Sequence, residues 1–84
     1  MQQVDKENLL LFARKVKTMR LKKSKSLNNF VFNSDYLTTA TWSRIENGKF
    51  DLKLSTLLRV SQMLGVTVDK LLKDVDFNYN FNEE

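Results

Sequence analysis

The 84-residue sequence contains no proline and only two glycines, Gly48 and Gly65. Because proline and glycine are the residues that most often interrupt helices, their scarcity favours a chain built from helices. Each glycine also follows a segment whose apolar residues recur at helical spacing, and glycine commonly ends a helix in the left-handed conformation. The sequence therefore predicts an all-α domain with helix ends at Gly48 and Gly65.

Five segments have apolar residues at three- and four-residue intervals, the spacing of an amphipathic helix. Residues that can cap a helix N-terminus stand before four of them, namely Asp5, Ser26, Thr38 and Thr67. The fourth helix should begin between residues 53 and 55. The first helix should end in the lysine-rich segment 22–25, and the second before a turn at residues 33–35. The third helix is expected over residues 39–47. The fourth should end at Gly65 and the fifth at about residue 74. A core stripe is expected along the first helix at Leu9, Phe12, Ala13, Val16 and Met19.

The chain has neither cysteine nor histidine. Disulfides and thiolate metal sites are therefore excluded, and the commonest catalytic bases, nucleophiles and zinc ligands are missing. We expect no enzyme activity, no metal and no cofactor. No apolar run approaches the roughly 20 residues that cross a bilayer, so no membrane association is expected. A reducing cytoplasm is the expected location.

The formal net charge is +4, but the charge is unevenly distributed. A basic front and an acidic tail suggest a polyanionic partner at one end only. Alternatively, the basic residues have no polyanionic partner and form an ordinary solvated helix face and a basic turn. The basic residues are Arg14, Lys15, Lys17, Arg20, Lys22, Lys23 and Lys25, and the acidic ones are Asp74, Asp76, Glu83 and Glu84.

The third expected helix, within "TTATWSRIENG", has two different sides. At 100° per residue, Trp42 and Ile45 fall together and predict a core contact, in preference to a base-stacking role for Trp42. The opposite side is short and polar, which suits a helix lying close to a surface. In a DNA major groove, threonine can meet base edges and arginine can make two hydrogen bonds to guanine.

The stretches "VKTMRLKKSKS", "TTATWSRIENG" and "LSTLLRVSQMLGVTVDKLL" together resemble the Cro/repressor-type helix-turn-helix family, also called the XRE family. The resemblance covers residues 9–72. It implies a five-helix lambda-repressor-like bundle over residues 1–74. It also implies that the second and third helices form the helix-turn-helix, with the third in the major groove of double-stranded DNA.

The resemblance implies a role for each matching residue. Arg20 and Glu46 match a structural ion pair that ties the first helix to the end of the third. The base-reading positions are Thr39, Ala40, Thr41, Ser43 and Arg44. The phosphate-contacting positions expected for such a fold are Lys22, Lys23, Lys25, Asn28, Asn47, Lys49 and Lys53.

Two features depart from this family. The segment 26–38 is longer than the usual second helix and turn, and in this respect resembles the DNA-binding domains of Rgg/ComR-type regulators. The usual glutamine at the start of the second helix is also absent, so that Asn28 or Asn29 would have to reach the phosphate.

Within the tail, residues 75–84, the stretch "VDFNYNFN" over residues 75–82 alternates apolar and polar residues with a period of two, which predicts a β-strand. A lone strand needs a partner edge, so one hypothesis is a ribbon between two copies in a homodimer. The alternative is a tail that folds its aromatic residues over its own bundle or remains frayed. The proposed dimerisation residues are Val75, Phe77, Tyr79 and Phe81.

Three functions are compatible with these features. The leading one is a sequence-specific DNA-binding transcriptional regulator, expected to be a small dimeric repressor. A second is a protein-interaction module, an antitoxin or adaptor, whose aromatic tail binds another protein. A third is the DNA-binding head of a peptide-responsive regulator, which the sequence favours less because the 84 residues contain no sensor domain.

Overall fold

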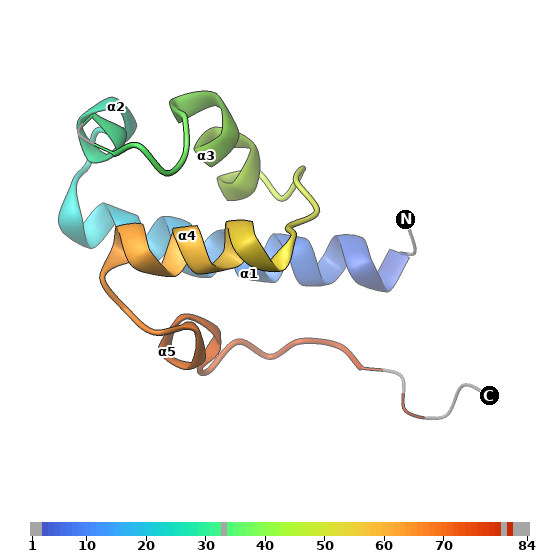
Figure 1. The fold of residues 1–84 in the computed structure, drawn as a ribbon. Coiled ribbons are helices and arrows are strands. Elements are labelled where there is room, and N and C mark those ends of the chain that lie inside the picture. Colours follow the sequence, from blue (N-terminus) through green and yellow to red (C-terminus); the bar gives the residue numbers. More distant parts are fainter. Residues whose placement is uncertain (1–2, 33, 80, 82–84) are drawn as a thin grey trace.

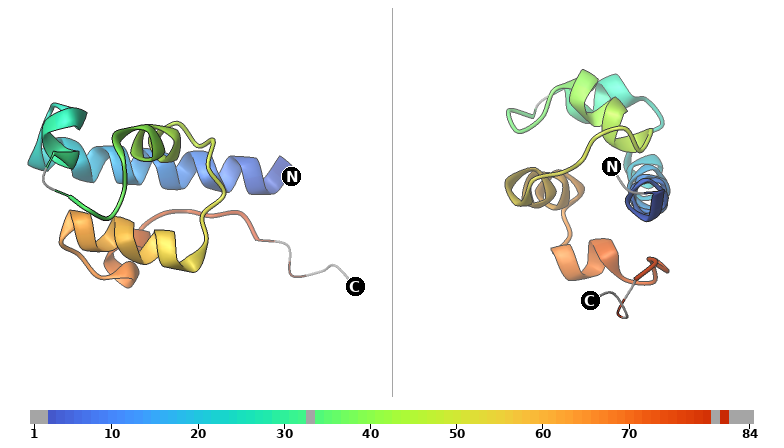
Figure 2. Two further views of the ribbon diagram at one scale, coloured as in Figure 1. Left: turned by 45° about the horizontal axis from the view of Figure 1, so that its top comes forward. Right: turned by 90° about the vertical axis from the view of Figure 1, so that its right-hand side faces the viewer.

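The structure is a computed structural model that describes residues 3–32, 34–79 and 81. Within these residues the chain forms five helices, and the prediction of an all-α bundle is confirmed. Helices α1 and α4 form a middle layer, with α2 and α3 on one side of it and α5 on the other (Figures 1 and 2). The helices are α1 Gln3–Lys23, α2 Leu27–Val31, α3 Thr39–Glu46, α4 Leu54–Leu64 and α5 Val68–Leu72.

The core lies between these layers and is centred on Trp42 of α3. Trp42 is 0% exposed, and its ring centroid lies 4.9 Å from that of Phe30 in α2. The predicted packing role of Trp42 is therefore confirmed. Of the predicted α1 stripe, Phe12, Ala13 and Val16 are buried, whereas Leu9 and Met19 are only partly buried. The other fully buried side chains are those of Val16, Ile45, Val60, Leu64 and Leu71.

Two of the four predicted caps act as expected. The side chain of Ser26 accepts a hydrogen bond from the backbone N–H of Asn29, and that of Thr38 accepts one from Thr41. Thr67 stands at the N-cap of α5 but its side chain makes no capping hydrogen bond. The expectation for Asp5 was wrong, because α1 already includes Gln3 and places Asp5 in its first turn, where the carboxylate complements the helix dipole.

The connections also differ in detail from the sequence-based expectation. In the α2–α3 connection, the N–H of Ser34 donates to the carbonyl of Val31 at 2.9 Å, as a turn requires, while residue 33 lies outside the described residues. Helix α4 begins at Leu54, within the predicted interval. Helix α5 ends at Leu72, before the predicted end, and Asp74 has a φ of 64°, which a continuing helix could not accommodate.

The predicted C-terminal strand is wrong for the described part of the tail. Residues 75–79 and 81 form no strand, and the tail runs as irregular chain along the bundle. Asn8 of α1 explains this, because its side-chain amide pairs with the backbone of Asn78. The N–H of Asn78 donates to Oδ1 of Asn8 at 2.8 Å, and Nδ2 of Asn8 donates to the Asn78 carbonyl at 3.0 Å. The alternative, a tail that folds its aromatic residues over its own bundle, holds for Phe77, which packs against the core, whereas Tyr79 and Phe81 are exposed.

Both glycines end helices in the left-handed conformation, as predicted, with φ of 69° at Gly48 and 71° at Gly65. Their surroundings differ. A Cβ at Gly48 would lie 2.7 Å from Cδ2 and 3.3 Å from the backbone Cα of Leu10 in α1, whereas a Cβ at Gly65 would meet only Nζ of Lys23 at 3.7 Å. Gly48 therefore also permits close packing of the α3 end against α1.

This difference predicts unequal effects of the same substitution. Gly65→Ala should lower the free energy of unfolding by about 1–2 kcal/mol, because a left-handed backbone disfavours a Cβ. Gly48→Ala should cost clearly more, because it adds the clash with Leu10. Urea unfolding of both variants beside wild type measures this. Equal losses would contradict the close α3–α1 contact.

Candidate nucleic-acid interface

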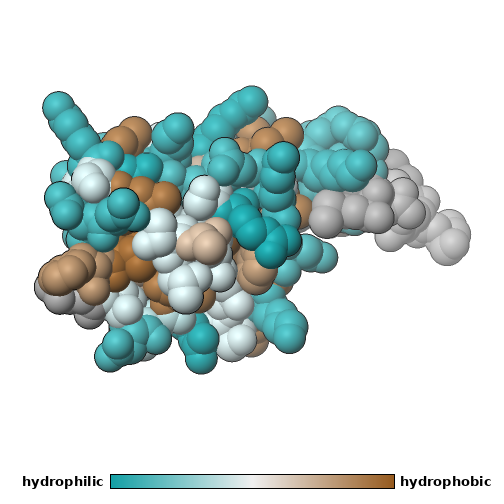
Figure 3. All heavy atoms as spheres, turned by 90° about the horizontal axis from the view of Figure 1, so that it is seen from above, coloured by the Kyte–Doolittle hydropathy of each residue, from teal (hydrophilic) through white to brown (hydrophobic). Residues whose placement is uncertain are grey.

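Helix α3 has the two-sided character that its sequence predicted. Trp42 and Ile45 are buried, while Ala40, Arg44 and Asn47, which are spaced one turn apart, are exposed. Seen from the side of α2 and α3, this face has side chains of intermediate hydropathy in its middle, with hydrophobic side chains beside them and hydrophilic ones projecting around much of the rim (Figure 3). The face is low and polar, and is not covered by another described helix.

The predicted base-reading residues all lie on α3, but their side chains differ in exposure and in the hydrogen bonds that they already make within the protein. Ala40 and Arg44 are exposed, and Thr39 is partly exposed at the start of the helix. Thr41 and Ser43 have the same intermediate exposure as Thr39, but both are hydrogen-bonded within the protein, and the Ser43 hydroxyl accepts from Nδ2 of Asn47 at 3.4 Å. The hydroxyl of Thr41 accepts a hydrogen bond from the Thr38 hydroxyl at 3.1 Å, which ties Thr41 to the helix cap. Thr39, Ala40 and Arg44 are therefore the members most open to a partner.

Arg44 makes a contact that the sequence did not reveal. Its guanidinium carbon lies 5.3 Å from the ring centroid of Phe50, a distance typical of a cation–π interaction. Phe50 itself packs against the hydrophobic core from the α3–α4 linker. An aromatic residue six positions after an arginine gives no reliable sequence signal, because the linker must fold back to bring the two together.

Asn47, predicted to approach phosphate, is the C-cap residue of α3. Its side-chain Nδ2 donates to the carbonyl of Ser43 at 2.8 Å, so that the amide folds back on the last turn of the helix. The residue remains exposed.

The predicted phosphate-contacting lysines are all exposed and lie on both sides of α3. Lys22 and Lys23 end α1, and Lys25 lies in the turn that leads to α2, with Asn28 exposed on α2 itself. Lys49 and Lys53 lie in the linker from α3 to α4. The two lysine-bearing segments, the α1–α2 turn and the α3–α4 linker, lie at opposite ends of the α2–α3 layer (Figure 1).

A shielded ion pair connects these parts. Nε and Nη2 of Arg20 each donate to a different carboxylate oxygen of Glu46 at 2.8 Å, and the two side chains are only 6% and 7% exposed. Nη1 of Arg20 donates to the carbonyls of Ser24 and Lys25, both at 3.1 Å. The structural pair implied by the family resemblance is thus present. It joins α1, the lysine-bearing turn and the end of α3.

Trp42 completes this network. Its indole Nε1 donates to Oε2 of Glu46 at 2.6 Å, so the carboxylate accepts three hydrogen bonds. Burial alone would raise the pKa of Glu46. The hydrogen bonds from Arg20 and Trp42, with the positive charges of Arg20 and Lys17, outweigh burial and hold that pKa below its ordinary value. The hydrogen bond to Glu46 likewise raises the pKa of Arg20, against the opposing effect of burial.

The long α2–α3 connection is fastened to α4, a feature that sequence reasoning missed. The hydroxyl of Tyr36 accepts a hydrogen bond from Nε2 of Gln62, and the carbonyl of Tyr36 accepts one from Arg59 at 3.4 Å. These contacts join residues 23 and 26 positions apart. The extra length of this segment therefore forms a connection anchored on α4 before Thr38 starts α3.

Residues 3–32, 34–79 and 81 contain no group of three or more His, Cys, Asp or Glu side chains that could hold a metal ion. None of the helices described is both long and apolar enough to cross a membrane.

Comparison of the chain with models of known protein families, with curated proteins and with solved structures gave no match. The helix-turn-helix resemblance consequently remains a prediction from the sequence.

The shielding of the ion pair predicts a large effect of removing its negative charge. Glu46→Gln should lower the free energy of unfolding by about 3 kcal/mol or more, because Arg20 is left as a buried charge without its counter-ion. Asp35→Asn, which removes an exposed carboxylate from the α2–α3 turn, should change stability by no more than about 0.5 kcal/mol. Urea unfolding at neutral pH compares the three proteins. A loss at Glu46 as small as that at Asp35 would refute a stabilising role for the pair.

The lowered pKa of Glu46 also predicts a dependence on pH. Glu46 binds its proton less readily in the folded protein than in the unfolded chain, so its contribution is fully present above its ordinary pKa of 4.5 and is lost as pH falls through the lower, folded value. The stability difference between wild type and Glu46→Gln should therefore shrink progressively below about pH 4.5. Urea titrations at several pH values test this, and a difference that grows on acidification would contradict it.

Proposed function

We propose that this protein is a sequence-specific DNA-binding transcriptional regulator that places the exposed face of α3 in the major groove of double-stranded DNA. The proposal rests on the way in which buried and exposed side chains are divided between the two sides of α3. Trp42 and Ile45 anchor one side in the core, and the other side presents a low polar surface around Ala40 and Arg44. A helix whose outward residues include side chains as short as those of Thr39 and Ala40 can approach base edges closely.

The flanking lysines support the same orientation. Lys22, Lys23 and Lys25 of the α1–α2 segment, and Lys49 and Lys53 of the α3–α4 linker, are exposed and could reach the phosphates beside an inserted helix, although Nζ of Lys23 lies near Gly65 in this structure. Contacts of this type position a protein without reading sequence. Each neutralised phosphate steepens the salt dependence of binding by about 0.9 in a log–log plot.

Base reading is assigned chiefly to Thr39, Ala40 and Arg44. The Ala40 methyl suits contact with the methyl group of thymine, and a guanidinium can donate two hydrogen bonds to guanine. The contact of Arg44 with Phe50 limits the conformations that the arginine samples before binding, which reduces the entropy lost when it docks. Phe50 is therefore assigned a supporting role in positioning Arg44.

The regulator is proposed to act as a small dimeric repressor, with two α3 helices in half-sites one helical turn apart, about 34 Å. The described tail does not supply the expected strand for pairing. Val75 and Phe77 are partly buried against the same chain, so these two predicted dimerisation residues are engaged within it. A dimer would have to use another surface or exchange the tail between copies.

A second candidate function rests on the end of the tail. The rings of Tyr79 and Phe81 stack at 5.4 Å with 17° between their planes, and these side chains are 70% and 86% exposed. Exposed large aromatic residues are a common feature of protein–protein contacts. The protein-interaction function, as antitoxin or adaptor, therefore remains the alternative. It predicts DNA binding that is weak, sensitive to salt and indifferent to sequence.

Selection from random duplex DNA at near-physiological salt distinguishes these functions. Wild type should recover one site, palindromic if the protein is dimeric, and Arg44→Ala should relax the preference at defined bases, at a cost of about 1–3 kcal/mol in binding free energy. Arg14→Ala is the charge-matched control. It removes the same charge from α1, where Arg14 lines a hollow with Asn78 of the tail and does not belong to the α3 face. Recovery of no common site, or equal effects of the two substitutions, would reject sequence reading by Arg44.

A further inference from the structure

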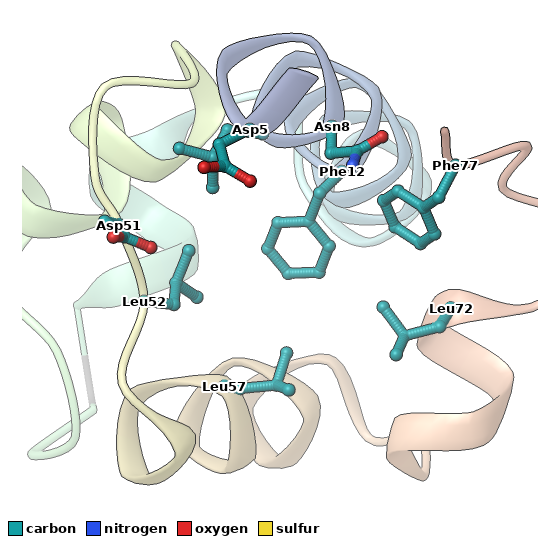
Figure 4. A pocket seen from close by; sticks show the side chains of 9 residues that line it. Asp5, Asn8, Phe12, Asp51, Leu52, Leu57, Leu72 and Phe77 are labelled. Atoms are coloured by element: carbon teal, nitrogen blue, oxygen red, sulfur yellow. The ribbon is translucent and has the colours of Figure 1, made fainter. Parts of the chain in front are cut away.

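A hollow of about 370 Å³ opens where the N-terminal half of α1, the α3–α4 linker, α4, α5 and the tail meet (Figure 4). Its walls are apolar and are contributed by five different parts of the chain. The apolar lining consists of Leu9, Phe12, Leu52, Leu57, Leu72 and Phe77. A volume of this size lies within the range of small-molecule sites, which is about 300–1,000 Å³.

Apart from Phe12, which belongs to the core, the apolar wall residues lie at the edge of the core. Among the six lining residues only Phe12 is buried, and the side chains of the others remain partly open to solvent. Partly exposed leucine and phenylalanine side chains around a single concavity leave apolar surface that an entering group would remove from water. Leu57 and Leu72 face Phe12 and Phe77 across the opening in Figure 4.

One side of this hollow carries negative charge. Asp5 on α1 and Asp51 in the α3–α4 linker both line it, and Figure 4 shows them on the same side, away from Phe77. Both residues are exposed, and no hydrogen bond or ion pair links either carboxylate side chain to another residue in the described part of the chain. Two carboxylates beside apolar walls favour a ligand that carries positive charge at one end.

The opposite side is held in place by the tail. Asn8, which also lines the hollow, pairs with the backbone of Asn78 through two hydrogen bonds of 2.8 and 3.0 Å. This pairing fixes Phe77, the residue before Asn78, as the far wall. The hollow therefore has a preformed apolar side and an acidic side.

From these features we propose that the hollow is a binding site for a small amphipathic cation, a molecule with an aromatic or aliphatic body and a primary ammonium group. The body lies among Leu57, Leu72 and Phe77, and the ammonium group lies beside Asp5 and Asp51. The site is separate from the exposed face of α3, and its occupancy does not depend on whether the protein binds DNA.

The probe for this site is the 2-phenylethylammonium ion, with the neutral 2-phenylethanol as an isosteric control and the slightly larger 3-phenylpropionate as a control of opposite charge. Titration followed by methyl-resolved NMR should move the signals of Leu9, Leu52, Leu57 and Leu72. The exposed Leu54 and Leu58 of α4, which do not line the hollow, should stay in place. For nine non-hydrogen atoms we expect a dissociation constant on the order of 1 mM. The neutral analogue should bind several-fold more weakly, and the anion more weakly still.

The double substitution Asp5→Asn and Asp51→Asn should remove the preference for the cation while leaving the affinity for 2-phenylethanol within about twofold. Asp35→Asn is the matched control and should leave both affinities unchanged. Equal binding of cation and anion by wild type would overturn the proposal. So would a cation preference that persists in the double variant, or signal changes at Leu54 and Leu58 in place of the pocket leucines.

Discussion

The hydrogen-bonded ion pair between Arg20 and Glu46 is the interaction on which the arrangement of the helices depends. One guanidinium holds the last residue of α3 and two carbonyls of the α1–α2 turn, and the same carboxylate accepts the indole N–H of Trp42. At 6% and 7% side-chain exposure, neither charge can rely on water for solvation. The two residues therefore have to remain together, and α1, the turn and α3 are held in one mutual orientation.

This orientation gives the surface around α3 its form. With Trp42 held by Glu46 and packed against Phe30, the helix cannot rotate without exposing its large aromatic side chain. Its small polar side is consequently kept outward, and the lysines of the α1–α2 turn are kept at its flank. Gly48 contributes at the other end, because only a residue without a Cβ lets the chain leave α3 so close to Leu10.

Features encoded by neighbouring residues could be predicted from the sequence. The caps at Ser26 and Thr38, the glycine helix ends and the burial of Trp42 depend on local hydrogen bonding and helical periodicity. The Arg20–Glu46 pair was expected only through the family resemblance. Contacts that depend on chain folding were missed, namely Arg44 with Phe50 and Tyr36 with Gln62. The period-two pattern of the tail predicted a strand, but a local pattern carries no information about a residue 70 positions away. In the structure, the side chain of Asn8 makes hydrogen bonds with the backbone of Asn78.

The proposal that α3 and the flanking lysines form a single surface for DNA is tested most directly by NMR mapping. Uniformly ¹⁵N-labelled protein would be titrated with a short duplex of mixed sequence at low salt. The account predicts that backbone amide signals of Thr39, Ala40 and Arg44 move together with those of residues 22–25, while those of Asn8 and Phe77 on the tail side stay in place. Changes confined to the lysine segment, or centred on the tail with α3 unaffected, would contradict it.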